Sequence, residues 1–294
     1  GRHPEWFDTW AREHRACREG VVLIDMSFMS KFHVGGRDAG AVLDWLATAR
    51  VDGPPGVITY TQMLSPRGRL QADLTITKLP TAAEGAPSEG FLVVATDTAH
   101  RHVEMLLRRG IEDSAHAIGT PTPFATVTDV TGGYAQINLQ GPRSRALLAE
   151  LTSADVSDAA FPFRAARRID IACATLLATR ITYVGELGYE LFVPVESAVH
   201  VYDAIVAAGA SHGLTHAGLK ALGSLRMEKG YRDYGHDLDN CDTLLEAGLG
   251  FTADYDKPGG FVGMEACLAQ RRAGGPAQRL VQVGLAEPEP LLYH

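Results

Sequence analysis

The feature that most constrains the fold is a stretch in which apolar and polar side chains alternate strictly. Four apolar and four polar residues take turns along it: Leu70, Gln71, Ala72, Asp73, Leu74, Thr75, Ile76 and Thr77. Because successive side chains of a strand point to opposite faces, this pattern predicts a strand over Arg69–Leu79 with one apolar face. Asp73 then points away from the apolar layer, into solvent or a polar cavity.

The segments before this strand predict a hairpin. The run Val57–Leu64 reads as a strand, and Ser65-Pro66-Arg67-Gly68 is typical of a turn. Asp38 is expected to N-cap a helix that carries Val42, Leu43 and Leu46.

The rest of the chain mixes strands with helices rather than alternating them strictly. An amphipathic helix is expected at the N-terminus, because Trp6, Trp10, His14 and Cys17 share one stripe. Three comparable strand-then-helix units follow, starting near residues 91, 125 and 175, and a last helix spans roughly 216–229. These units predict an α+β fold, internally repeated, with mixed and largely antiparallel sheets and flanking helices.

Composition and charge narrow the class of protein. The net charge is -8, which argues against a nucleic-acid surface, because phosphate binding needs a concentrated basic face. No apolar run approaches the ~20 residues that span a bilayer, so we expect no membrane partner. The cysteines lie far apart without metal-ligand spacing, which favours buried thiols over disulfides and a cytoplasmic location. No metal site is predicted.

Two clusters carry candidate chemistry. In the first, Gly185 and Gly188 permit a turn between strands, with Tyr183 and Glu190 beside it. A ring that stacks and a carboxylate that accepts two N–H bonds suit a flat heterocycle with an amino-pyrimidine edge. A hairpin with a surface glutamate is the alternative interpretation. In the second, Arg226 sits among apolar residues, where a guanidinium usually pairs with an anion; a solvated helix face is the alternative.

Together these segments resemble the glycine-cleavage T-proteins (aminomethyltransferases). Tyr183–Glu190 resembles their Y-T-G-E-D-G-Y-E turn, and residues 225–238, LRMEKGYRDYGHDL, resemble their L-R-L-E-A-G helix end. Arg69–Leu74 resembles their G-G-I-x-D-D-L strand, and Asn138–Ser144 their L-x-G-P-x-[SA] segment. The N-terminal block, including Trp6-Phe7 and Lys31-Phe32, is more similar to the folate-binding C-terminal half of dimethylglycine and sarcosine dehydrogenases.

The resemblance implies a fold built around a central folate cavity, with tetrahydrofolate as cofactor. It implies that Asp73 is the catalytic carboxylate beside the reactive pterin nitrogen. Glu190 would hold the amino edge of the pterin and Tyr183 would be the neighbouring aromatic. Arg226 and Tyr234 would line the far side, and Phe163 would stack on the ring.

Two departures separate this chain from the T-protein pattern. Leu187 replaces the aspartate usual in the turn, and Ala95-Thr96 stands where those proteins have an asparagine. Both favour the dehydrogenase-linked branch. There, a flavin domain oxidises an N-methyl amine, and the iminium or formaldehyde is captured as 5,10-methylenetetrahydrofolate.

The resemblance therefore predicts the folate domain of a dimethylglycine- or sarcosine-type oxidoreductase. Its FAD would belong to a partner domain or subunit, because no flavin motif is present. A glycine-cleavage aminomethyltransferase and a catalytically silent folate-binding module remain the alternatives. The folate-binding domain is expected over residues 1–270, with subdomain breaks near 50 and 125. Residues 271–294 are expected to begin a C-terminal β-barrel or a tail.

Overall fold

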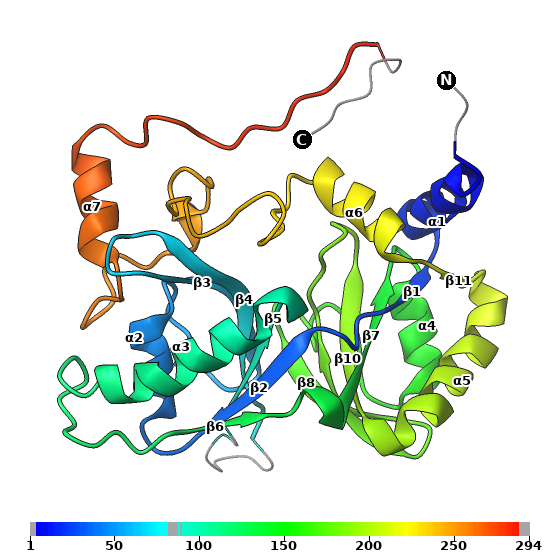
Figure 1. Cartoon of the computed structure of the whole chain (residues 1–294). Helices are drawn as coiled ribbons and strands as arrows, with labels where there is room; N and C mark the ends of the chain where they lie inside the picture. Colours follow the sequence, from blue (N-terminus) through cyan, green and yellow to red (C-terminus); the bar gives the residue numbers. More distant parts are fainter. Residues whose placement is uncertain (1–3, 82–87, 89, 288–294) are drawn as a thin grey trace.

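The computed structural model describes residues 4–81, 88 and 90–287 and shows two sheets side by side (Figure 1). The five-stranded sheet has the order β3-β4-β5-β2-β6. Its strands are β2 (Ser30–Gly35), β3 (Val57–Leu64), β4 (Leu70–Lys78), β5 (Phe91–Ala95) and β6 (Thr126–Asp129). The six-stranded sheet has the order β11-β1-β7-β10-β9-β8. Its strands are β1 (Val22–Asp25), β7 (Tyr134–Gln140), β8 (Ala166–Ile171), β9 (Ala174–Thr179), β10 (Gly188–Pro194) and β11 (Thr215–His216).

All strand pairs are antiparallel except β1 with β11, and the α+β prediction is confirmed. The chain starts in the six-stranded sheet with β1, builds the five-stranded sheet with β2 to β6, and then returns. The helices are α1 (Phe7–Glu19), α2 (Ala39–Leu46), α3 (His100–Asp113), α4 (Ser144–Leu151), α5 (Ala198–Gly209), α6 (Leu219–Glu228) and α7 (Met264–Arg272).

Each sheet has one apolar face covered by helices. The face of β4 formed by Ala72, Leu74 and Ile76 packs in one core with residues of α2 and α3, such as Leu43 and Leu107. This is the alternation expected from the sequence, and the predicted strand and turn are confirmed to within a residue at each end.

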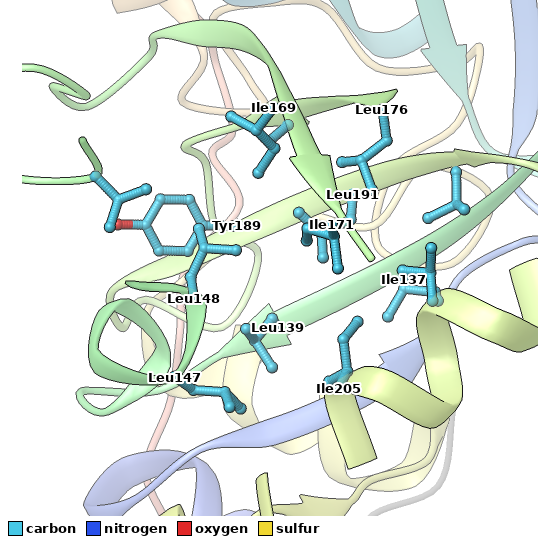
Figure 2. Packing of buried hydrophobic residues seen from close by; sticks show 14 of the residues in the cluster. Ile137, Leu139, Leu147, Leu148, Ile169, Ile171, Leu176, Tyr189, Leu191 and Ile205 are labelled. Atoms are coloured by element: carbon cyan, nitrogen blue, oxygen red, sulfur yellow. The ribbon is translucent and has the colours of Figure 1, made fainter. Parts of the chain in front are cut away.

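The corresponding face of the six-stranded sheet packs on α4 and α5. Figure 2 shows Leu147 and Leu148 of α4 and Ile205 of α5 against the strand residues Leu139 and Leu191. The two helix-covered faces therefore point outward.

The uncovered faces of the two sheets meet. Leu92 and Val94 of β5 pack with Leu177 of β9 and Phe192 of β10 in a shared apolar cluster. At the neighbouring edges the backbone joins the sheets, because Ile58 N–H donates to the Arg164 carbonyl at 2.9 Å. The space between the sheets is therefore apolar at this point, and polar residues on the same inner faces line the rest of it.

Three local expectations need correction or comment. The Asp38 side chain does not cap α2; it accepts from the Phe124 N–H at 2.7 Å and pairs with Arg37. Of the cysteines, Cys17 and Cys267 are buried, but Cys173 and Cys241 are exposed, and all are free thiols. The part of the expected tail that is described, residues 271–287, begins with the last two residues of α7 and contains no strand; residues 288–294 lie outside the described residues. None of the helices in the described ranges has the length and apolar character needed to cross a membrane.

Candidate functional site

Asp73 lies on the inner face of β4, opposite the side that packs on α2 and α3. Directly across the hairpin, in register, is Gln62 of β3. Gln62 is fully buried, and its Nε2 donates to Asp73 Oδ1 at 2.8 Å. Tyr60, two residues earlier on β3, also hydrogen-bonds to Asp73. Of the two surroundings expected for Asp73, the structure shows the polar interior.

Burial raises the pKa of Asp73 to about 6, although the hydrogen bonds from Gln62 and Tyr60 pull it down. The charged groups that act on it come from the segment after α6: Asp233 raises the pKa and Arg232 lowers it. A carboxyl group that titrates near neutrality can both accept and release a proton there.

Glu190 lies on β10 of the six-stranded sheet. Its neighbours on β10, Tyr189 and Leu191, belong to the outer core, so Glu190 faces inward. Its partner in register on β7 is Asn138, whose Nδ2 donates to Glu190 Oε1 at 3.4 Å. Burial raises the pKa of Glu190 to about 7, opposed by Asn138 and by the charge of Lys31.

Lys31 adds a buried positive charge near Glu190. It is fully buried on β2, and its Nζ donates to the carbonyls of Ser27 and Met29 at 3.0 and 2.8 Å. Burial lowers the pKa of Lys31 to about 8, while Asp25 and Glu190 raise it. The interior around Glu190 therefore contains both a carboxyl group and the buried Lys31 ammonium group.

The strand beside Glu190 carries an excess of hydrogen-bond acceptors. The side-chain oxygens of Gln136, Asn138 and Gln140 on β7, and of Thr179 on β9, are buried without a hydrogen-bond partner. They share the inner face with Glu190, because Ile137 and Leu139 point to the outer core. Buried acceptors normally find donors in the protein, in water or in a ligand, so this face suits a ligand edge rich in N–H groups.

Tyr183 does not sit at a strand end as expected. Strand β9 ends at Thr179 and β10 begins at Gly188, so residues 180–187 form a loop rather than a tight turn. The Tyr183 hydroxyl donates to the Arg232 carbonyl at 2.5 Å, and its ring stacks on Tyr231. Its pKa is raised by burial and by Asp233 and Asp73 among other charges. Tyr183 is therefore grouped with Asp73 rather than with Glu190.

Arg226 has the anionic partner expected of it, but that partner belongs to this chain. The guanidinium is 7% exposed and pairs with both carboxylate oxygens of Asp237, and it also donates to the Tyr231 carbonyl at 3.1 Å. Asp237 in turn accepts from the Asp233 N–H at 3.1 Å. Arg226 thus orders the segment after α6 that places Arg232 and Asp233 beside Asp73.

The other two predicted residues differ in placement. Tyr234 is half-buried, and its pKa is raised by burial and by Asp239 and Asp73, so it belongs to the Asp73 group. Phe163 is 60% exposed, unlike the two buried carboxylates. Its stacking role stays a prediction.

The sequence reasoning missed the polar partners of both carboxylates. Gln62 could have been found by counting back through the hairpin turn, which places it opposite Asp73. Asn138 and Lys31 could not, because their positions beside Glu190 depend on pairings between distant strands.

Among the described residues no group of three or more His, Cys, Asp or Glu could hold a metal ion. A hollow of about 480 Å³ lies elsewhere, lined by Leu245, Phe251, Arg271 and Arg279 among others.

The raised pKa values predict a pH-dependent stability. Both carboxyl groups have a higher pKa in the folded chain than their ordinary values of 3.8 and 4.5. The folded chain therefore favours their protonated forms, and the free energy of unfolding decreases as the pH rises from about 4 to 7 and the buried groups become charged. We expect Asp73→Asn and Glu190→Gln to raise the Tm at pH 8 by about 2–4 °C each. The gain should shrink toward pH 4.5 in thermal melts. Asp113→Asn, an exposed control, should not change the Tm, and a lower Tm for both inner variants would contradict the assignment.

Arg226→Ala should loosen the segment after α6. The substitution removes the guanidinium from the half-buried Asp237 and leaves only the Asp233 N–H and the His236 ring beside it, which costs about 1–3 kcal/mol of unfolding free energy. Arg226→Lys should recover only part of this, because lysine lacks the planar fork that bonds both oxygens. Urea unfolding of these variants, with the exposed Arg109→Ala as control, measures the loss. A loss equal to that of the control would show that Arg226 does not hold this segment.

The fold and the site define an α+β domain whose two sheets enclose carboxylates and amide acceptors. The model of the GCVT N-terminal domain matches residues 2–257, and the chain belongs to this family, whose members bind tetrahydrofolate. The resemblance noted in the sequence is thereby confirmed. A solved structure, the glycine cleavage system aminomethyltransferase T from Bartonella henselae, has the same fold, with a TM-score of 0.74 at 24% identity. The match covers 90% of this chain and 67% of that one.

Similar curated proteins are mostly larger enzymes. The 4-methylaminobutanoate oxidase (formaldehyde-forming) of Paenarthrobacter nicotinovorans is 40% identical over 99% of this chain and 33% of its own length. Human mitochondrial sarcosine dehydrogenase is 38% identical over 98% of this chain and 31% of its own. The chain thus spans about a third of the length of these relatives. The aminomethyltransferase of Bacillus velezensis is 32% identical over 97% of this chain and 73% of its own length.

Proposed function

We propose that this chain transfers a one-carbon unit from an N-methyl amine to tetrahydrofolate, as the folate domain of a flavin amine oxidoreductase. The unit arrives either as an iminium ion, whose transfer to the two folate nitrogens releases the demethylated amine and a proton, or as formaldehyde, whose transfer releases water. The observation that carries the proposal is the pair of inward-facing carboxylates, Asp73 and Glu190, whose burial raises their pKa values to about 6 and about 7.

The residues around Glu190 fit tetrahydrofolate. The carboxylate and the unpartnered oxygens of Asn138 and its neighbours on β7 form an acceptor-rich face, and the amino-pyrimidine edge of a pterin carries N–H donors. Glu190 would hold this edge by charge-assisted hydrogen bonds. Tetrahydrofolate itself supplies the amine nitrogens that take up formaldehyde, giving 5,10-methylenetetrahydrofolate and water.

Asp73 is proposed to act as the proton-handling group. Its carboxylate would hydrogen-bond to the attacking amine or take its proton, a function that suits a pKa of about 6. Tyr183 and Tyr234 would pack near the reacting end, and Arg226 would act indirectly, by holding the segment that carries Arg232. The flavin would belong to another domain or subunit, a proposal supported by the names and greater lengths of the dehydrogenase and oxidase relatives. A cytoplasmic location stays a prediction.

The direct test uses the purified chain. Calorimetry should show binding of 5-formyltetrahydrofolate, a stable folate. With tetrahydrofolate and formaldehyde, the formation of 5,10-methylenetetrahydrofolate should exceed the rate without protein, as followed with a coupled methylenetetrahydrofolate dehydrogenase. Absence of folate binding at millimolar concentration would refute the proposal.

Two other functions are distinguished by the same assays. The 32% identity to an aminomethyltransferase over most of both chains favours transfer from an aminomethylated lipoyl carrier. Adding such a carrier to the transfer assay in place of formaldehyde would test this function. The Leu187 side chain, which replaces the aspartate of the T-protein turn, counts against it. The mouse pyruvate dehydrogenase phosphatase regulatory subunit is 31% identical over 92% of this chain, which favours a silent module. Folate binding without any transfer would support that function.

A further inference from the structure

Gln62 makes contacts on both sides of its amide group. On one side Nε2 donates to Asp73 Oδ1 at 2.8 Å. On the other side Oε1 faces the hydroxyls of Thr252 and, at 3.5 Å, of Thr48. The Thr252 hydroxyl also lies 2.8 Å from the Leu249 carbonyl, so its single proton can go to either oxygen. Gln62 has no exposed surface, so no bulk water competes for these groups.

The ionised form of Asp73 can only accept hydrogen bonds, so it takes the NH₂ group of Gln62 and leaves Oε1 facing the two threonines. A hydroxyl that donates to Oε1 holds the oxygen away from Asp73 and leaves the NH₂ group toward it. An NH₂ group can stabilise a carboxylate but cannot accept a proton from a carboxylic acid. Thr252 comes from the short segment Gly250–Thr252, 190 residues away in sequence, so the tertiary structure sets the orientation of an amide beside Asp73.

We propose that Gln62, held by Thr252, is a positioning residue that orients the Asp73 carboxylate and stabilises its ionised form. Its catalytic consequence rests on the proposed function. The carboxylate itself is faced by few other groups: Tyr60 from β3, Arg232 and Asp233 from the segment after α6, and more distantly Tyr183 and Tyr234. Arg232 and Asp233 act in opposite directions, which leaves the hydrogen bonds from Gln62 and Tyr60 as the specific stabilisation of the ionised form.

The first measurement does not depend on catalysis. The pKa of Asp73 is followed by NMR of the ¹³C-labelled carboxyl group in the full chain, with Asp73→Asn used to assign the signal. Gln62→Leu should raise this pKa by about one to two units, the loss expected for a hydrogen bond to a charged group. Thr252→Val should produce a smaller rise, and Thr252→Ser, which keeps the hydroxyl, should restore the wild-type value. Gln270→Leu on α7 is the matched control and should leave the Asp73 pKa unchanged.

The second measurement uses the transfer assay. In Gln62→Leu and Thr252→Val the pH at which the rate falls should move upward together with the Asp73 pKa, while the KM for folate stays within about twofold. If Gln62→Leu fails to fold, the comparison of Thr252→Val with Thr252→Ser is sufficient to test the inference. An Asp73 pKa that is unchanged in a folded Thr252→Val chain would overturn the inference. A shifted pKa in a chain that never transfers carbon would leave the positioning intact and refute the proposed function instead.

Discussion

Replacing Asp73 with asparagine is expected to slow the formation of 5,10-methylenetetrahydrofolate by about a hundred- to ten-thousandfold. Asparagine keeps the size of the side chain and can still accept a hydrogen bond, but it cannot take up a proton. Because asparagine at this position on β4 can keep the contact with the buried Gln62, the loss should fall on kcat rather than on folate affinity. Rates at saturating folate, corrected for the reaction without protein, measure it.

The control and the conservative variant sharpen this test. Asp113→Asn, an exposed change at the end of α3, should leave the rate within about twofold. Asp73→Glu keeps the acid but moves it by one methylene, and displacement by about 1 Å in a positioned site costs on the order of a hundredfold. An Asp73→Asn chain as fast as wild type would remove the catalytic role of this carboxylate.

Replacing Glu190 with alanine is expected to weaken folate binding by at least about thirtyfold. Truncating one partner of a buried charge-assisted contact costs about 2–5 kcal/mol, and here it would remove the carboxylate on this inner face that the ligand's N–H donors would meet. Glu190→Gln should lose less, because one acceptor oxygen remains. Calorimetry with 5-formyltetrahydrofolate at pH 8 gives the three affinities. Equal affinities would show that Glu190 does not hold the ligand.

The same carboxylate predicts how binding changes with pH. Burial raises the pKa of Glu190 to about 7, and only the ionised form accepts two N–H bonds. Wild-type affinity should therefore fall by up to about tenfold for each pH unit below 7 and level off above it. Glu190→Gln should lack this slope between pH 5.5 and 8. A slope that persists in the variant would assign the titration to another group, of which the nearest with a shifted pKa is Lys31.

Local patterns along the chain were sufficient to predict the hairpin and the side of the sheet to which the Asp73 side chain points. Alternation in β4 and the turn at residues 65–68 depend only on neighbours in sequence, and the apolar face they imply packs on α2 and α3 as expected. Arg226 was likewise recognised as a guanidinium in need of an anion. The resemblance of several motifs was enough for the family.

What the sequence could not determine is which groups meet across the interior. Glu190 pairs with Asn138, 52 residues earlier, and lies near Lys31 on the other sheet; Gln62 contacts Thr252, 190 residues later. The spacing of Tyr183 and Glu190 predicted a joint site, yet the loop before β10 places the ring with Asp73. Periodicity records the face of a strand on which a residue lies, because that depends on the backbone alone. The side chains that a residue contacts depend on strand pairing, and its pKa depends on burial. Both are set by the tertiary structure alone.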